Sequence, residues 1–116
     1  MFHQASSKEN SSLTVAKFGG TSVADYQAML RCAHIIKNDT SNRLVVVSAS
    51  AGVTNYLVRL GQENVNIEEQ ADIIAKIQAI QYNITQHFSK DIEQSLNSEI
   101  ANLLDQLSTH SAKQSQ

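Results

Sequence analysis

A short aliphatic run that ends in a lysine and a pair of glycines constrains this chain more than any other feature. Residues Leu13–Phe18 are mostly apolar and β-branched, which predicts a strand. Gly19 and Gly20 follow at once, and they allow a tight turn in which bare N–H groups can approach a ligand. An amphipathic pattern over Val23–Lys37 then predicts a helix. The succession of strand, glycine turn and helix indicates an α/β unit.

The side chains around the glycine pair suit a phosphate group. Lys17 ends the predicted strand and supplies a mobile positive charge. The hydroxyls of Thr21 and Ser22 can cap the following helix, whose N-terminus favours negative charge. We hold capping and phosphate contact equally open for these hydroxyls, since the two roles do not exclude each other. The turn is therefore a candidate phosphate-binding loop.

The order of these residues excludes two common nucleotide-binding motifs. In a Walker A loop the lysine follows the glycines, whereas Lys17 precedes Gly19. The spaced glycines of a dinucleotide-binding motif are also missing from the sequence. Asp25 is interpreted as a first-turn residue that favours the helix dipole.

A second strand is predicted at Leu44–Val47, where four aliphatic residues follow one another as in a parallel strand that is covered on both faces. A loop of small residues, Ser48–Gly52, comes next, and Thr54–Leu60 has the pattern of a short helix. Two strands joined by a helix are expected to pair in parallel. Since ligands gather at the carboxyl ends of such strands, Ser48 and Ser50 are candidate binding residues.

The second half of the chain is helical in pattern. Apolar residues recur at three, four or seven positions from Ile67 to Phe88 and again from Ile92 to Leu107, with a break near Ser89. This periodicity predicts two long amphipathic helices that pair antiparallel.

The domain organisation follows from these segments. Residues 1–12 are polar and are predicted to be a disordered extension, and residues 109–116 are predicted to be a polar tail. Residues 13–108 are predicted to form one incomplete domain, because the aliphatic faces of a two-stranded parallel sheet are difficult to cover without further strands. We therefore expect the first part of a larger α/β domain.

Composition narrows the classes of function and the location. The formal net charge is −2, from 9 basic and 11 acidic residues, and there is no basic run. We therefore expect no binding to nucleic acid or to a membrane surface. No apolar run is long enough to cross a bilayer, and the polar N-terminus lacks the apolar core of a signal peptide. The single cysteine, Cys32, is interpreted as a small packing residue, and it fits a cytoplasmic location.

Two motifs together resemble those of the aspartokinases in the amino acid kinase family. The first is the stretch from Lys17 to Val23, KFGGTSV, and the second is the stretch from Ser48 to Asn55, SASAGVTN. The resemblance extends from about Leu13 to Ser108 and favours the lysine-sensitive type. It implies the N-terminal part of a three-layer αβα fold of the carbamate kinase-like kind, with parallel strands followed by a helical hairpin.

The resemblance also implies a reaction. Aspartokinases transfer a phosphoryl group from ATP to the side-chain carboxylate of L-aspartate, which gives 4-phospho-L-aspartate and begins lysine, threonine and methionine biosynthesis. Mg²⁺ is implied together with ATP, held mainly by the ATP phosphates, so the sequence names no protein ligand for it. The intact protein is expected to be a homo-oligomer.

The implied site residues fall into two groups. The first group contacts the phosphates and consists of Lys17, Gly19, Gly20, Thr21 and Ser22. Within it, Lys17 is the implied catalytic residue, which contacts the transferring phosphoryl group. The second group holds aspartate and consists of Ser48, Ser50 and Thr54. For Ser50 and Thr54 a turn or a helix cap is the alternative interpretation.

Two alternative functions remain open at this point. One is another amino acid kinase, such as a glutamate, acetylglutamate or uridylate kinase. The other is a truncated, non-enzymatic module whose helical hairpin binds a partner. The adenine-binding segment and the regulatory ACT domains of aspartokinases have no counterpart in the 116 residues, so we expect the chain alone to be inactive.

Overall fold

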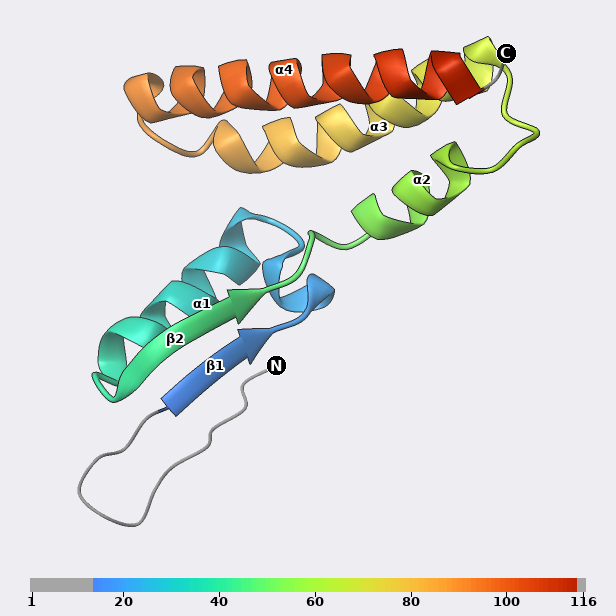
Figure 1. The fold of residues 1–116 in the computed structure, drawn as a ribbon. Coiled ribbons are helices and arrows are strands. Elements are labelled where there is room, and N and C mark those ends of the chain that lie inside the picture. The colour runs from blue at the N-terminus through green and yellow to red at the C-terminus, as the bar shows by residue number, and fades with distance from the viewer. Residues whose placement is uncertain (1–13, 115–116) are drawn as a thin grey trace. The chain divides into compact units, whose positions relative to one another are not determined.

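The computed structural model describes residues 14–114, without the side chains of residues 42, 43 and 112–114. The elements follow the order β1 (Thr14–Phe18), a 3-10 helix η1 (Gly20–Val23), α1 (Tyr26–Asn38), β2 (Asn42–Val47), α2 (Val53–Leu60), α3 (Ile67–Thr85) and α4 (Lys90–Gln114) (Figure 1). The chain divides into two compact units, the first ending at Ala51 and the second beginning at Gly52. The α/β class and the parallel strands followed by a helical hairpin are confirmed. The predicted extension, residues 1–12, lies outside the described residues.

In the first unit, β1 and β2 pair in parallel, with Phe18 opposite Val47. Side chains of a strand point alternately to the two faces of a sheet, and β1 shows this alternation in its burial. Ala16 and Phe18 are buried, whereas Lys17 between them is exposed. The two faces of β1 therefore carry different roles, and Lys17 lies on the face opposite Phe18.

Helix α1 covers the face of the strands to which Phe18 belongs (Figure 1). The core of the unit joins two strand residues to one residue of η1 and one of α1: Ala16, Phe18, Val23 and Cys32. Met29 and Ile36 of α1 pack against this cluster. Cys32 is 8% exposed, which confirms its interpretation as a packing residue.

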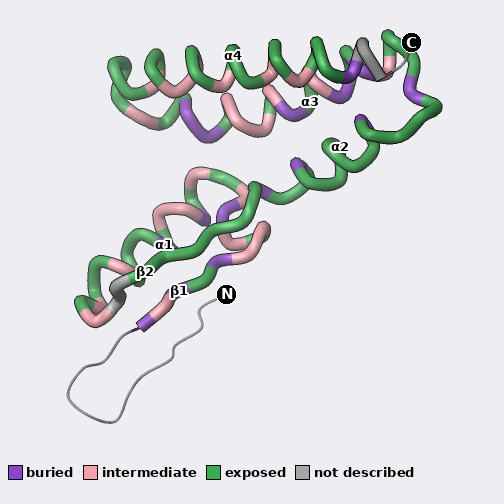
Figure 2. The backbone as a smooth tube through the Cα atoms, viewed as in Figure 1, coloured by how far each residue is buried: buried purple, intermediate pink, exposed green. Residues whose placement is uncertain are grey.

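The second strand is bare along its aliphatic part. The exposed fraction ranges from 39% at Val45 to 60% at Val47, and Figure 2 shows the strand as exposed along this part. A continuous aliphatic strand is typical of the interior of a parallel sheet, where both faces are covered. Within the described residues the sheet has two strands only. The exposed aliphatic residues of β2 are therefore those expected of a strand in a larger parallel sheet.

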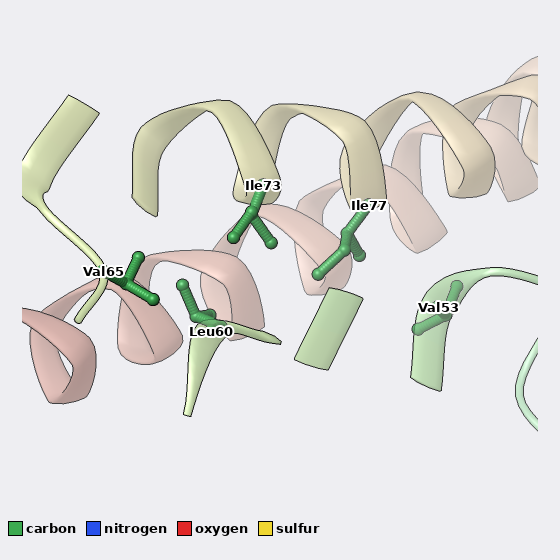
Figure 3. Close-up of a cluster of buried hydrophobic side chains, with 5 residues drawn as sticks. All are labelled: Val53, Leu60, Val65, Ile73 and Ile77. Atoms are coloured by element: carbon green, nitrogen blue, oxygen red, sulfur yellow. The ribbon is translucent and has the colours of Figure 1, made fainter. Parts of the chain in front are cut away.

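The second unit is helical. α3 and α4 run antiparallel as a hairpin (Figure 1), and α2 packs against α3. Figure 3 shows the cluster that joins α2, the following loop and α3: Val53, Leu60, Val65, Ile73 and Ile77. A partly buried hydrogen bond, which Thr85 Oγ1 donates to Asn97 Oδ1 at 2.6 Å, links α3 to α4. None of the described helices is long and apolar enough to span a bilayer.

Three helix ends differ from the sequence prediction. α1 begins at Tyr26 rather than at Val23, because η1 occupies the preceding residues. α3 ends at Thr85, and the turn to α4 takes up the apolar residue Phe88. α4 continues to Gln114, through much of the predicted polar tail, and its buried Ser111 accepts a hydrogen bond from Gln70 Nε2 at 3.4 Å through its carbonyl oxygen. This contact shows why a polar segment without apolar periodicity still extends the hairpin.

An ion pair also joins α2 to α3. Arg59 donates two hydrogen bonds to the carboxylate of Glu69, at 2.7 and 2.8 Å. These hydrogen bonds, followed by the attraction of the charges, hold the pKa of Glu69 below its usual range. A carboxyl whose pKa is lower in the folded chain stabilises the fold above its unfolded pKa, about 4.3. The stabilisation is lost as the pH falls from there through the lowered folded pKa.

We expect Glu69→Gln to lower the urea midpoint of unfolding at about pH 7 and to have no such effect at about pH 2, where the wild-type carboxyl is also neutral. The effect is small because both side chains are exposed. Glu68→Gln is the matched control, since Glu68 lies in the same first turn of α3. An equal, pH-dependent loss in both variants would show that charge in this turn, and not the pair with Arg59, causes the effect.

Candidate functional site

The candidate site lies where β1 and β2 pass into the loops that follow them. The amide of Ser48 donates to the carbonyl of Phe18 at 3.1 Å, which extends the strand pairing past the end of β2. A Cβ built on Gly20 would lie 3.3 Å from the carbonyl oxygen of Ala49 and 3.5 Å from Ser48 Oγ. The glycine turn and the small-residue loop are thus in contact. The structure brings together the two motifs that the sequence separates by more than twenty residues.

Lys17 is exposed one residue before the end of β1 and three residues before Gly20 in the sequence. In the strand register it lies beside Val46 of β2. Its backbone is held in the sheet while its side chain is exposed on the face that α1 does not cover. An ammonium group on a four-carbon stem can therefore reach a ligand at the carboxyl edge of the strands.

Gly19 and Gly20 differ in the structural reason for a glycine at each position. Gly19 has φ −80° and ψ −177°, which any residue adopts, and a Cβ built on it meets nothing within 4 Å. Neither backbone conformation nor packing within the chain therefore demands glycine at this position. Gly20, by contrast, packs against the second loop. A ligand that approaches the backbone closely is the remaining physical reason for a glycine at position 19.

This difference predicts opposite effects on stability. Gly19→Ala should leave the chain as stable or raise its free energy of unfolding by about 0.4–1 kcal/mol, because alanine restricts the unfolded chain. Gly20→Ala should lower it relative to Gly19→Ala by about 1 kcal/mol, because a backbone carbonyl must move. Urea denaturation of the two variants measures the difference. A loss at Gly19 equal to that at Gly20 would show that position 19 also has a packing role.

The hydroxyls of Thr21 and Ser22 do not cap α1, so this part of the prediction is wrong. Both residues belong to η1, and the cap of α1 is Asp25, whose carboxylate accepts from the amide of Ala28 at 2.8 Å. Asp25 is therefore a capping residue rather than a first-turn residue. The sequence did offer the signal, since an aspartate directly before an amphipathic helix is a strong cap.

The two serines of the second loop have different surroundings. Ser48 is exposed, and its hydroxyl donates to the neighbouring Ala49 carbonyl at 2.6 Å. Ser50 is only 7% exposed, and its hydroxyl donates to the carbonyl of Val23 at 2.7 Å. A ligand can compete for the Ser48 hydroxyl, whereas the Ser50 hydroxyl is already used inside the protein.

Thr54 belongs to the second compact unit. It is exposed in the first turn of α2, two residues after Gly52. Gly52 has φ +93°, a left-handed conformation in which glycine is strongly favoured, and there the chain turns from the loop into α2. The structure thus places Thr54 in the first turn of a helix that begins within the second motif.

A cavity of about 420 Å³ adjoins η1 in the first unit. Its lining combines the two hydroxyl residues of η1 with the end of β1 and one side of α1: Phe18, Thr21, Ser22, Ala28, Arg31, Cys32 and Ile35. Lys17 does not line it. Among the residues that the structure describes, no group of three histidine, cysteine or acidic side chains could hold a metal ion.

Comparison with known proteins identifies the family. The sequence model of the amino acid kinase family matches residues 12–115, so this chain belongs to the amino acid kinase family. Over 70 residues, 59% of this chain, it is 54% identical to the lysine-sensitive aspartokinase 3 of Escherichia coli. Over 48 residues it is 65% identical to a Haemophilus influenzae protein whose name describes it as an inactive aspartokinase 3; these cover 41% of this chain and 40% of that protein.

A solved structure extends the similarity to the fold. The crystal structure of E. coli aspartokinase III in complex with aspartate and ADP matches 89% of this chain with a TM-score of 0.81 and 39% sequence identity. The chain spans 22% of that crystallised protein, and 16% of the E. coli relative in the sequence comparison. The described elements therefore correspond to a minor part of a full-length aspartokinase.

Proposed function

We propose that this chain forms the N-terminal part of the phosphoryl-transfer site of a lysine-sensitive aspartokinase. The reaction would transfer a phosphoryl group from ATP to the side chain of L-aspartate, giving 4-phospho-L-aspartate at the start of lysine, threonine and methionine biosynthesis. The observation that carries the proposal is the contact of Gly20 with Ser48 and Ala49. A phosphate-binding turn and an acceptor-binding loop must lie this close if the donor and the acceptor are to meet. A cytoplasmic homo-oligomer is part of the proposal for the intact protein.

The residues of the first motif would bind and stabilise the negative charge of the phosphates. Phosphoryl transfer depends mainly on positioning and on stabilising the charge of the moving group. The exposed Lys17 would contact that group, while backbone N–H groups at Gly19 and Gly20 and the hydroxyls of η1 would hold the ATP phosphates. The aspartate carboxylate is ionised at neutral pH and needs no general base.

Aspartate would be held by the exposed hydroxyl of Ser48. The assignment of Thr54 to aspartate rests on the resemblance of the second motif to that of the aspartokinases. Mg²⁺ bound with ATP would neutralise phosphate charge, and the resemblance to the aspartokinases implies that ATP itself would supply most of its ligands. ADP and aspartate are both present in the E. coli structure that this chain matches, which supports this choice of donor and acceptor.

A chimera tests the proposal. Residues 14–114 of this chain replace the matching segment of the E. coli relative, and ADP formation is measured with L-aspartate, L-glutamate, N-acetylglutamate or UMP as acceptor. We expect turnover with aspartate that exceeds turnover with each of the others. Higher turnover with another acceptor would show that the proposed substrate, aspartate, is wrong. A folded chimera without turnover would contradict a catalytic role for this segment.

A further inference from the structure

We infer that Ser50 and Cys32 are positioning residues, which hold the phosphate turn from inside the protein without touching the ligands. The expected effect on catalysis rests on the proposed function. The hydrogen bonds that hold the turn do not depend on it. The sequence did not predict this role for either side chain. The resemblance to the aspartokinases implied that Ser50 binds aspartate, and Cys32 was interpreted as a packing residue.

Both side chains bond to the end of η1. The last carbonyls of a helix lack partners within the helix. Cys32 Sγ donates to the carbonyl of Ser22 at 3.1 Å, and Ser50 Oγ donates to the carbonyl of Val23 at 2.7 Å. The donors are only 8% and 7% exposed. Two consecutive carbonyls at the end of a four-residue helix are thus satisfied by buried side chains from elsewhere in the chain.

The two donors come from two different segments, both of which follow the turn in the sequence. Cys32 belongs to α1, which follows the turn, and Ser50 belongs to the loop after β2. At its beginning the turn is tied to the sheet, since the Phe18 carbonyl accepts from the amide of Ser48. The segment between Phe18 and Val23 is therefore held by hydrogen bonds at both ends, which limits the arrangements that its backbone N–H groups can adopt.

Such fixation matters for a site that works by positioning. Preorganised N–H groups stabilise developing charge because they need no reorganisation when the charge moves. A turn that shifts by 1 Å can lose about 100-fold in rate. Ser50 also couples the two motifs, because one hydrogen bond joins the loop that holds the acceptor to the turn that holds the donor.

Amide hydrogen exchange of the whole chain tests the inference without any nucleotide. The amide of Ser22 bonds to the carbonyl of Gly19 at 3.0 Å and reports on the turn. We expect Ser50→Ala to speed its exchange about 10-fold, as for the loss of one buried hydrogen bond. Ser50→Cys, which keeps a weaker donor, should fall between wild type and Ser50→Ala. Ser48→Ala in the same loop is the control and should leave the Ser22 amide unchanged.

A local effect separates positioning from general stability. Amides of α3, in the other unit, should exchange as in the wild type. Equal acceleration throughout the first unit, or no change at Ser22, would overturn the inference. If Ser50→Ala does not fold, the pair Cys32→Ala and Cys32→Ser decides the question, since only the second keeps a donor for the Ser22 carbonyl.

Kinetics of the chimera then distinguish this role from ligand contact. Ser50→Ala should lower kcat about 10-fold or more and change KM for aspartate less than twofold. A raised KM with unchanged kcat would instead show that Ser50 binds aspartate. An inactive parent chimera would count against the proposed function, while the exchange result at Ser22 would still decide the positioning role.

Discussion

Lys17→Ala in the chimera should lower kcat for aspartate-dependent ADP formation by 100- to 1000-fold, about 3 kcal/mol of transition-state stabilisation. Lys17 is exposed one residue before the end of β1, a strand whose backbone is held by pairing with β2. The ammonium group would act most strongly on the moving phosphoryl group, where charge is redistributed, so KM for aspartate should change much less. Initial rates over a range of aspartate concentrations measure both constants.

Two companion variants sharpen this result. Lys37→Ala removes the same charge from the exposed last turn of α1 and should leave kcat within twofold of the parent. Lys17→Arg keeps the charge but changes its shape and reach, and it should restore only part of the rate. If Lys17→Ala retains the parental kcat, the phosphoryl contact must come from another residue.

The fold was predictable because the strongest local signals belong to the elements that form. The aliphatic run of β2, the glycine pair and the long apolar periods of α3 and α4 each favour one kind of structure. The helix ends were not predictable in the same way. α4 extends through polar residues because Ser111 meets Gln70 across the hairpin, a contact between residues far apart in the sequence.

The candidate site could be proposed from the sequence where the order of residues along the chain carries the signal. Lys17 and the glycines are recognisable from their order along the chain, and the structure shows the open space at Gly19 that such a role needs. The difference between Ser48 and Ser50 was hidden, because two serines separated by one alanine look equivalent in a sequence. In the structure Ser50 is buried and donates to the carbonyl of Val23, whereas Ser48 is exposed. This difference depends on tertiary packing, which the local sequence does not reveal.

Phe18 ties the site to the core, and Phe18→Ala should lower the free energy of unfolding of the first unit by about 3–5 kcal/mol. Its side chain is 2% exposed in a cluster with Ala16, Val23 and Cys32, so its removal leaves a cavity among residues of three elements. This loss is a large fraction of the roughly 5–15 kcal/mol that stabilises a typical domain. Native-state amide exchange of β1 and α1 measures it residue by residue.

Val47→Ala is the matched control, because Val47 is the partner of Phe18 in the strand register but is 60% exposed. It should cost less than about 1 kcal/mol, since little apolar surface returns to water. Amides of α3 and α4 should keep their protection in Phe18→Ala, because they belong to the other compact unit. An equal loss in both units would show that the chain unfolds as a single cooperative body. A loss below 1 kcal/mol at Phe18 would instead mean that the turn, and with it the proposed site, is held without this core.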